Sequence, residues 1–247
     1  MTSVRLERDG PVVRVTLARA EQRNALDPEL IAGLTEAFEA VGAARAVVLA
    51  GDGPSFCAGA DVEWMRSSIH LSYEENVEDA LRLRSLLDAI DGCPAPVVAR
   101  VHGHALGGGC GLLACCDVVI AAEDTVFGFT EAKLGIVPAV ISPFVVAKIG
   151  PSASRRYFVT GERFNARIAL RIGLVHELAD DAEPVVAELL SAGPEAARVA
   201  KQLARRSHDA NETARMTAER RTSAEGQEGL RAFLEKREPS WRSRNSS

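Results

Sequence analysis

The stretch VHGHALGGGCG spans residues 101–111 and joins two apolar segments of the chain. The segment before it, residues 97–101, predicts a buried strand, and the one after it, residues 112–115, predicts a helix. Three consecutive glycines are unfavourable inside a helix, so they mark the junction. Such a junction either forms a plain tight turn or lets an anionic ligand approach the helix N-terminus, where N–H groups are free.

Strand and helix patterns alternate on both sides of this junction and predict an α/β fold. The pair Asp27-Pro28 is typical of a helix start. Beyond about residue 150 the patterns become mostly helical, and the last part has few large apolar side chains, so we expect it to pack on another surface, such as a second subunit. The predicted strands cover residues 4–8, 12–17, 46–50, 97–101, 118–121 and 125–128, and the predicted helices cover residues 29–41, 73–90, 112–115, 152–160, 166–172, 182–190, 196–203 and 210–235.

Composition and charge exclude several classes of protein. The 247 residues include 29 Lys and Arg against 34 Asp and Glu, for a formal net charge of −5. We therefore expect no nucleic acid partner, because phosphates require a basic surface. The apolar stretches are broken well short of the roughly 20 residues that cross a bilayer, and the N-terminus lacks the pattern of a signal peptide, so we expect no membrane association.

The pattern of cysteines predicts no disulfide bonds, and the pattern of histidines predicts no metal site. An odd number of cysteines without C-x-x-C spacing predicts buried free thiols in a reducing compartment, and hence a cytoplasmic protein. His102 and His104 would share one face of a strand, but no third ligand lies nearby in the sequence, so we interpret both as structural and expect no metal site. The cysteines are Cys57, Cys93, Cys110, Cys115 and Cys116.

Two further segments carry chemistry. Residues 55–61 read SFCAGAD, and their small side chains would let a ligand reach backbone N–H groups, although a tight turn would use the same residues. Residues 127–138 read FGFTEAKLGIVP and hold Glu131 among apolar residues between two glycines. Burial would raise the pKa of Glu131 and suit it to proton transfer, whereas a solvated surface glutamate is the ordinary alternative.

Together these segments resemble the crotonase superfamily of enoyl-CoA hydratases and isomerases. The likeness runs from NAL at residues 24–26 through FCAGAD, HALGGGCGL, CD, FGFTEAKLGIVP and GERFNARIALRIGLVHEL, and covers most of the first 180 residues. It implies a crotonase-like (ClpP/crotonase) ββα spiral with the active site over residues 1–190, followed by a helical C-terminal region, residues 191–247, that serves trimerisation. The implied assembly is a homotrimer or a dimer of trimers.

The resemblance also assigns roles to single residues. Glu131 matches a catalytic glutamate of the family, and the N–H groups of Ala60 and Gly108 match its oxyanion hole. Such a hole stabilises the enolate formed from a thioester carbonyl, by about 3–4 kcal/mol per donor. For Asp61 we expect a helix-capping role rather than a catalytic one. The implied substrate- and coenzyme A-binding set is Arg23, Ala25, Ala58, Asp61, Gly107 and Gly111, with Arg23 as the cation for a phosphate.

One departure from the family leaves the reaction open. The second catalytic glutamate of the hydratases falls at Gly111, which has no side chain. A single carboxylate favours an isomerase that moves a double bond between the α- and γ-carbons. Residues 137–144 and 154–158, however, resemble a bacterial branch described as hydratases of branched, methylglutaconyl-type thioesters. We therefore predict an enoyl-CoA hydratase, with a Δ3-Δ2-enoyl-CoA isomerase and a non-catalytic acyl-CoA-binding protein as alternatives.

The predicted substrate is an acyl-CoA thioester. Coenzyme A then arrives as part of the substrate, and we expect no separate cofactor, because the thioester carbonyl is itself the electron sink. The resemblance implies a setting in fatty acid metabolism, in β-oxidation. Candidate walls of the acyl pocket are Trp64, Met65 and Phe144.

Overall fold

The computed structural model describes residues 3–205 and 207–242 and contains a six-stranded sheet in the order β1-β2-β3-β4-β6-β9. Strands β1 (Val4–Asp9) and β2 (Val12–Leu17) form an antiparallel hairpin in which Val4 lies opposite Leu17. The other strand pairs of this sheet are parallel. Its remaining strands are β3 (Ala46–Gly51), β4 (Val97–Val101), β6 (Val118–Ala121) and β9 (Glu177–Leu178).

A second, three-stranded sheet has the order β5-β7-β8. It consists of β5 (His104–Leu106), β7 (Val126–Gly128) and β8 (Arg163–Asn165). Only His102 and Gly103 separate β4 from β5, so the chain passes from one sheet to the other directly before the glycine junction. Gly103 has φ +63°, and a Cβ on it would clash with the carbonyl oxygen of Pro54, so this turn requires glycine.

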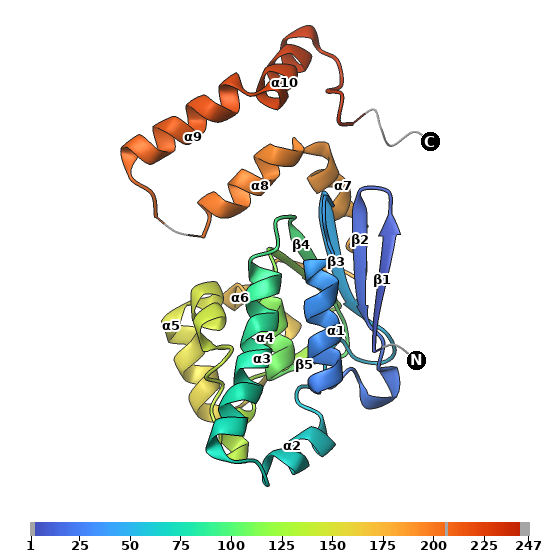
Figure 1. Cartoon of the computed structure of the whole chain (residues 1–247), viewed down its shortest axis with the longest axis vertical. Coiled ribbons are helices and arrows are strands. Elements are labelled where there is room, and N and C mark those ends of the chain that lie inside the picture. Colours follow the sequence, from blue (N-terminus) through green and yellow to red (C-terminus); the bar gives the residue numbers. More distant parts are fainter. Residues whose placement is uncertain (1–2, 206, 243–247) are drawn as a thin grey trace.

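Helices cover the sheets, and Figure 1 shows α1 and α3 running side by side over the first of them. α3 also packs on α4, and α4 on α5. Among the residues that the structure describes, no helix is long and apolar enough to cross a membrane. The helices are α1 (Pro28–Glu39), α2 (Val62–Ser68), α3 (Tyr73–Asp91), α4 (Gly108–Cys115), α5 (Ser142–Thr160), α6 (Ala166–Ile172), α7 (Glu183–Ser191), α8 (Pro194–Leu203), α9 (Ala210–Thr222) and α10 (Ala224–Glu235), with 3₁₀ turns η1 (Ala20–Gln22) and η2 (Glu131–Leu134).

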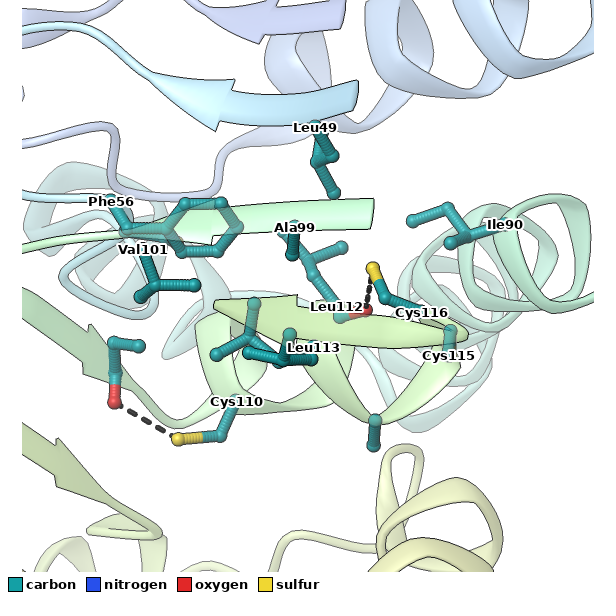
Figure 2. Close-up of a cluster of buried hydrophobic side chains, with 14 of the residues drawn as sticks. Leu49, Phe56, Ile90, Ala99, Val101, Cys110, Leu112, Leu113, Cys115 and Cys116 are labelled. Carbon is teal, nitrogen blue, oxygen red and sulfur yellow. Dashed lines mark hydrogen bonds between the residues drawn. The ribbon is translucent and has the colours of Figure 1, made fainter. Parts of the chain in front are cut away.

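Helix α4 is buried over almost its whole length and forms part of the main hydrophobic core. Figure 2 shows its leucines and cysteines among side chains of the sheet and of α3. The thiol of Cys110 donates to the carbonyl oxygen of Ala105 at 2.9 Å, and the thiol of Cys116 donates to that of Leu112 at 3.3 Å. All five cysteines are free and buried, as predicted, and burial raises the pKa of Cys57 to about 12.

The structure confirms the predicted strands and corrects several other elements. Strands β5, β8 and β9 were not predicted, because two or three residues carry no recognisable alternation. α4 begins at Gly108, not at residue 112, because tertiary contacts override the low helix propensity of glycine. A Cβ on Gly109, for example, would lie 2.8 Å from the carbonyl oxygen of Cys57.

Two predicted helices differ in extent. α5 starts at Ser142, ahead of the expected residue 152, and contains a non-helical Gly150 (φ 74°, ψ 164°) before Pro151. The single helix expected over residues 210–235 is two helices, because Ser223 (φ −66°, ψ 157°) is extended. Its hydroxyl accepts from the N–H of Gly226 and so starts α10.

The C-terminal helices lie beyond one end of the core and are tied to it by cations (Figure 1). The ammonium of Lys201 in α8 is 2.7 Å from Oδ2 of Asp117 and 3.2 Å from the carbonyl oxygen of Ala95. The guanidinium of Arg45, after α1, donates to carbonyl oxygens at the end of α7 and near the C-terminus. The division into a core over residues 1–190 and a trimerisation region over residues 191–247 stays a prediction.

Candidate active site

The N-terminus of α4 is the centre of the candidate site. Its N-cap, Gly107, has φ +50° and ψ −118°, which side-chain-bearing residues rarely adopt, and its N–H donates to the carbonyl oxygen of Gly128 at 2.8 Å. A Cβ on Gly107 would lie 3.2 Å from Oε1 of Glu131. The glycine is therefore needed twice, for the turn and for the close approach of the carboxylate.

Two backbone N–H groups near this point form no hydrogen bond within the described part of the chain. Gly108 is the first residue of α4, where an N–H has no partner inside the helix. Ala60 forms a parallel β-bridge with Leu26. The N–H of Leu26 donates to the carbonyl oxygen of Gly59 at 2.7 Å, and the N–H of Asp61 donates to the carbonyl oxygen of Leu26 at 2.8 Å. In such a bridge the central residue turns its own N–H away from its partner.

The segments that carry these two groups run side by side. Cys57 pairs in parallel with Ala105, and the N–H of Leu106 donates to the carbonyl oxygen of Cys57 at 3.0 Å. Ala60 and Gly108 each follow a member of this pair by three residues. The pairing therefore brings both to the same end of the two segments, at the positive end of the α4 dipole.

Glu131 opens η2 and places its carboxyl beside this helix end. Its Oε2 is buried and has no hydrogen-bond partner among the described residues. Burial raises the pKa of Glu131, opposed only by a hydrogen bond from its own backbone. A carboxyl suited to proton transfer therefore lies beside the N-terminus of α4, where a negatively charged oxygen would be stabilised.

Gly111, four residues after Gly107 in α4, lies beside an apolar side chain instead of a carboxyl. Gly111 donates its N–H to the carbonyl oxygen of Gly107 at 3.2 Å and is buried. A Cβ on Gly111 would clash with Cγ2 of Ile141 and lie 3.0 Å from its Cβ, with Cδ2 of Leu87 at 3.7 Å. The position at which the hydratases carry their second glutamate is thus filled by an apolar side chain from the start of α5.

The loop before α1 is held by Arg19, which connects two helix starts. Its guanidinium is 2.9 Å from Oδ2 of Asp27 and 3.5 Å from Oδ2 of Asp61, and it donates to the carbonyl oxygen of Ala25 at 2.8 Å. Asp27 caps α1 and Asp61 caps α2, as the sequence predicts. Nothing in the sequence pattern singles out Arg19, because Asp27 and Asp61 meet only in the folded chain; its nearness to the NAL motif is the one available signal.

The other expected binding residues line the same region. Arg23 is exposed with φ +51°, and its carbonyl oxygen accepts from the N–H of Ala58 at 3.0 Å. Ala25 is buried and Ala58 half-buried. Asn24 bonds through its amide to the carbonyl oxygens of Asp52 and Ser55, both at 2.8 Å, which fixes this loop against the SFCAGAD segment.

The two histidines beside the junction contact backbone and hydroxyl groups. Nε2 of His102 is 2.8 Å from the carbonyl oxygen of Gly53, and Nδ1 of His104 is 3.4 Å from the hydroxyl of Ser55. These contacts fit the structural interpretation. Over residues 3–205 and 207–242, no group of three or more His, Cys, Asp or Glu side chains is arranged to hold a metal ion.

Comparison with known proteins places the chain in one family. The family described as enoyl-CoA hydratase/isomerase matches residues 7–244. A crotonyl-CoA hydratase of Syntrophomonas wolfei is 32% identical, over 94% of this chain and 95% of its own. The structure of an enoyl-CoA hydratase from Shewanella pealeana superimposes with a TM-score of 0.90 at 38% identity, covering 97% of this chain and 96% of that one. Pseudomonas aeruginosa AtuE gives a TM-score of 0.91 at 38% identity, with 97% and 99% covered.

Proposed function

The chain belongs to the enoyl-CoA hydratase/isomerase family, and we propose that it is an enoyl-CoA hydratase, which reversibly adds water to a 2-enoyl-CoA thioester. The observation that carries the proposal is the position of Glu131. Its buried carboxyl lies against Gly107, at the helix end where Ala60 and Gly108 supply N–H donors. A proton-transfer group beside two donors for an oxyanion suits addition to a conjugated thioester.

The proposed reaction uses one carboxyl twice. The thioester oxygen accepts from the N–H groups of Ala60 and Gly108, which lowers the energy of the enolate. Ionised Glu131 takes a proton from water as the water oxygen bonds to C3 and the C2–C3 double bond becomes the enolate. Glu131 then returns that proton to C2, so that water supplies both the hydroxyl group and the hydrogen. The reverse sequence eliminates water.

A second candidate, the Δ3-Δ2-enoyl-CoA isomerase, is favoured by Gly111. The contact with Ile141 excludes a second carboxylate at this position, and an isomerase needs only one group that carries a proton between C2 and C4. The hydratase is preferred because the relatives and solved structures compared above include a crotonyl-CoA hydratase and an enoyl-CoA hydratase.

One pair of assays separates these reactions. The purified protein is incubated with crotonyl-CoA and, separately, with 3-hexenoyl-CoA, and the absorbance of the conjugated thioester is followed. A hydratase removes this absorbance from the first and forms 3-hydroxybutyryl-CoA. Appearance of conjugated absorbance in the second, without loss in the first, identifies an isomerase. Binding of butyryl-CoA without turnover of either substrate identifies an acyl-CoA-binding protein.

We also propose how the enzyme binds coenzyme A, how it assembles and where it acts. Coenzyme A enters as part of the substrate and no separate cofactor takes part, since the thioester carbonyl accepts the electrons. Arg23, exposed beside Ala58, is the proposed cation for a coenzyme A phosphate. A homotrimer or dimer of trimers in the cytoplasm, acting in β-oxidation, completes the proposal; the five free, buried thiols suit a reducing compartment.

A further inference from the structure

Asp79 of α3 is a buried carboxylate that the mechanism does not use. Of residues 73–85, all of which the structure describes, only Asp79 is buried. Its Oδ2 accepts a hydrogen bond from the indole Nε1 of Trp64 in α2 at 2.6 Å, and its Oδ1 accepts one from Arg82 at 3.2 Å. The Arg82 side chain is 58% exposed, so this ion pair alone does not require a buried carboxylate. The indole is the partner that accounts for the burial of Asp79.

The direction of α3 places Asp79 in front of α4. Cδ2 of Leu87 lies 3.7 Å from the position of a Cβ on Gly111, and Asp91 and Cys115, at the far ends of the two helices, line one cavity. The two helices therefore run in the same direction. Asp79 precedes Leu87 by eight residues, or about 12 Å of helix rise, whereas α4 begins only three residues before Gly111. Asp79 thus lies level with the space beyond the N-terminus of α4.

Trp64 reaches this space from the other side. It follows the proposed oxyanion donor Ala60 by four residues, in the first turn of α2. The indole is half-buried and packs against the main core, and its single N–H donates to the carboxylate of Asp79. The ring therefore extends from the segment that carries Ala60 to α3, across the front of α4.

The hydrogen bond to Asp79 matters for the placement of this ring because α2 has few other anchors. None of the seven described residues of α2 is buried. The acceptor is a carboxylate at 2.6 Å, and hydrogen bonds to ionised groups are stronger than those between neutral groups. Loss of this acceptor would leave the partly exposed indole free to turn away from α3.

We propose that Trp64 forms a wall of the substrate pocket in front of α4, and that Asp79 is the positioning residue that holds the indole there. The accessible part of the indole contacts the bound acyl-CoA beside the N–H of Ala60. This inference rests on the proposed function, because it takes the thioester to lie at the N–H groups of Ala60 and Gly108.

The test compares kcat/KM for crotonyl-CoA in the wild type and three variants. Asp79→Leu removes the acceptor, whereas Asp79→Asn keeps an oxygen for the indole N–H. Asp88→Leu is the matched control, because Asp88 is an aspartate of the same helix that pairs with Arg84 at 2.9 Å rather than with Trp64. We expect a fall of at least about tenfold in Asp79→Leu and of less than about threefold in the other two. A smaller fall in Asp79→Leu, or a comparable fall in either other variant, overturns the proposal.

A second readout does not depend on turnover. The sequence has two tryptophans, Trp64 and Trp241, so Trp241→Phe leaves Trp64 as the fluorescent reporter. Trp241 lies near the C-terminus, where its Nε1 donates to the carbonyl oxygen of Ser191. Saturation with butyryl-CoA should change the emission of Trp64 in this background, and the added Asp79→Leu should reduce that change. Calorimetric binding without a change in emission overturns the assignment of Trp64 as a wall.

Two further outcomes are decisive. If Asp79→Leu does not fold, Trp64→Phe, which keeps an aromatic ring but has no N–H for Asp79, should lower kcat/KM at least about threefold, and no fall overturns the proposal. If the wild type turns over neither crotonyl-CoA nor 3-hexenoyl-CoA but binds butyryl-CoA, the proposed function fails, and the emission of Trp64 alone decides its role. Absence of both turnover and binding overturns both proposals.

Discussion

Glu131 and Gly107 show how one contact shapes the site at the scale of single residues. The carboxyl reaches the N-terminus of α4 only because position 107 has no side chain and adopts φ +50°. The motif around Glu131 indicated a buried acid from the sequence, but its neighbour on α4 could not be predicted, because the contact forms between segments 24 residues apart. The same holds for Ile141 over Gly111.

Gly107→Ala should therefore damage both backbone and site. The added Cβ lies 3.2 Å from Oε1 of Glu131, and alanine is strained at φ +50°. Displacement of the carboxyl should lower kcat on crotonyl-CoA by about tenfold to a hundredfold. Gly10→Ala is the control, because Gly10 has φ +54° with nothing within 4 Å of its Cβ. Equal loss of activity in both variants would mean that backbone strain alone is responsible.

The pH dependence of stability reports on the same carboxyl. Burial raises the pKa of Glu131, so between its unfolded and folded values the folded chain binds more protons than the unfolded chain. The free energy of unfolding contributed by Glu131 therefore falls as the pH rises through that window. Glu131→Gln cannot ionise, so its stability relative to the wild type should increase as the pH rises above the ordinary pKa of glutamate, measured by urea unfolding. A difference in stability that does not change with pH would refute a buried carboxyl at Glu131.

At the scale of elements, the sequence predicts a helix start correctly where that start depends only on its own residues. The N-caps Asp27 and Asp61 behave as their neighbouring sequence predicts. Elements whose existence depends on distant partners escaped prediction: β8 exists through its pairing with β7, and the early start of α5 places Ile141 on α4.

An ion pair with a buried lysine helps to attach α8 to the core, beside a hydrogen bond from Arg198 of α8 to the carbonyl oxygen of Ala44. The side chain of Lys201 is only 6% exposed and lies 2.7 Å from Oδ2 of Asp117. Lys201→Met leaves this carboxylate without its cation and should lower the free energy of unfolding by about 3 kcal/mol. Arg66→Met removes an exposed pair with Glu63 and should change stability by less than about 1 kcal/mol. Urea denaturation measures both, and similar effects would show that the Lys201 pair is not special.

At the scale of the whole molecule, the alternation of strand and helix patterns predicted the α/β class, and the motifs indicated the family. Strand order did not follow from the sequence, because parallel neighbours such as β4 and β6 are set by packing across the sheet. The candidate site could be predicted residue by residue only through the resemblance. Its geometry, in which the pairing of Cys57 with Ala105 brings Ala60 and Gly108 to the same end of two segments, could not.

The C-terminal helices leave apolar surface exposed, which bears on assembly. In α10, Leu230, Phe233 and Leu234 are 49%, 81% and 77% exposed. Contiguous surface of this kind is typical of a subunit contact. The proposed homotrimer should therefore dissociate in Phe233→Asp, because the contact would bury an unpaired charge. Analytical ultracentrifugation should find a trimer or hexamer for the wild type and a monomer for the variant, whereas Val159→Asp on α5, at 77% exposure, tests whether any apolar surface site has this effect.

Turnover of crotonyl-CoA by Glu131→Gln, measured beside its affinity for butyryl-CoA, tests the account most directly. Loss of the Glu131 carboxyl beside the proposed oxyanion donors should lower kcat by about 10²–10⁴-fold, while butyryl-CoA binds about as tightly as to the wild type. A variant that keeps hydration within about tenfold of the wild type, with binding intact, would contradict the assignment of Glu131 as the acid and base.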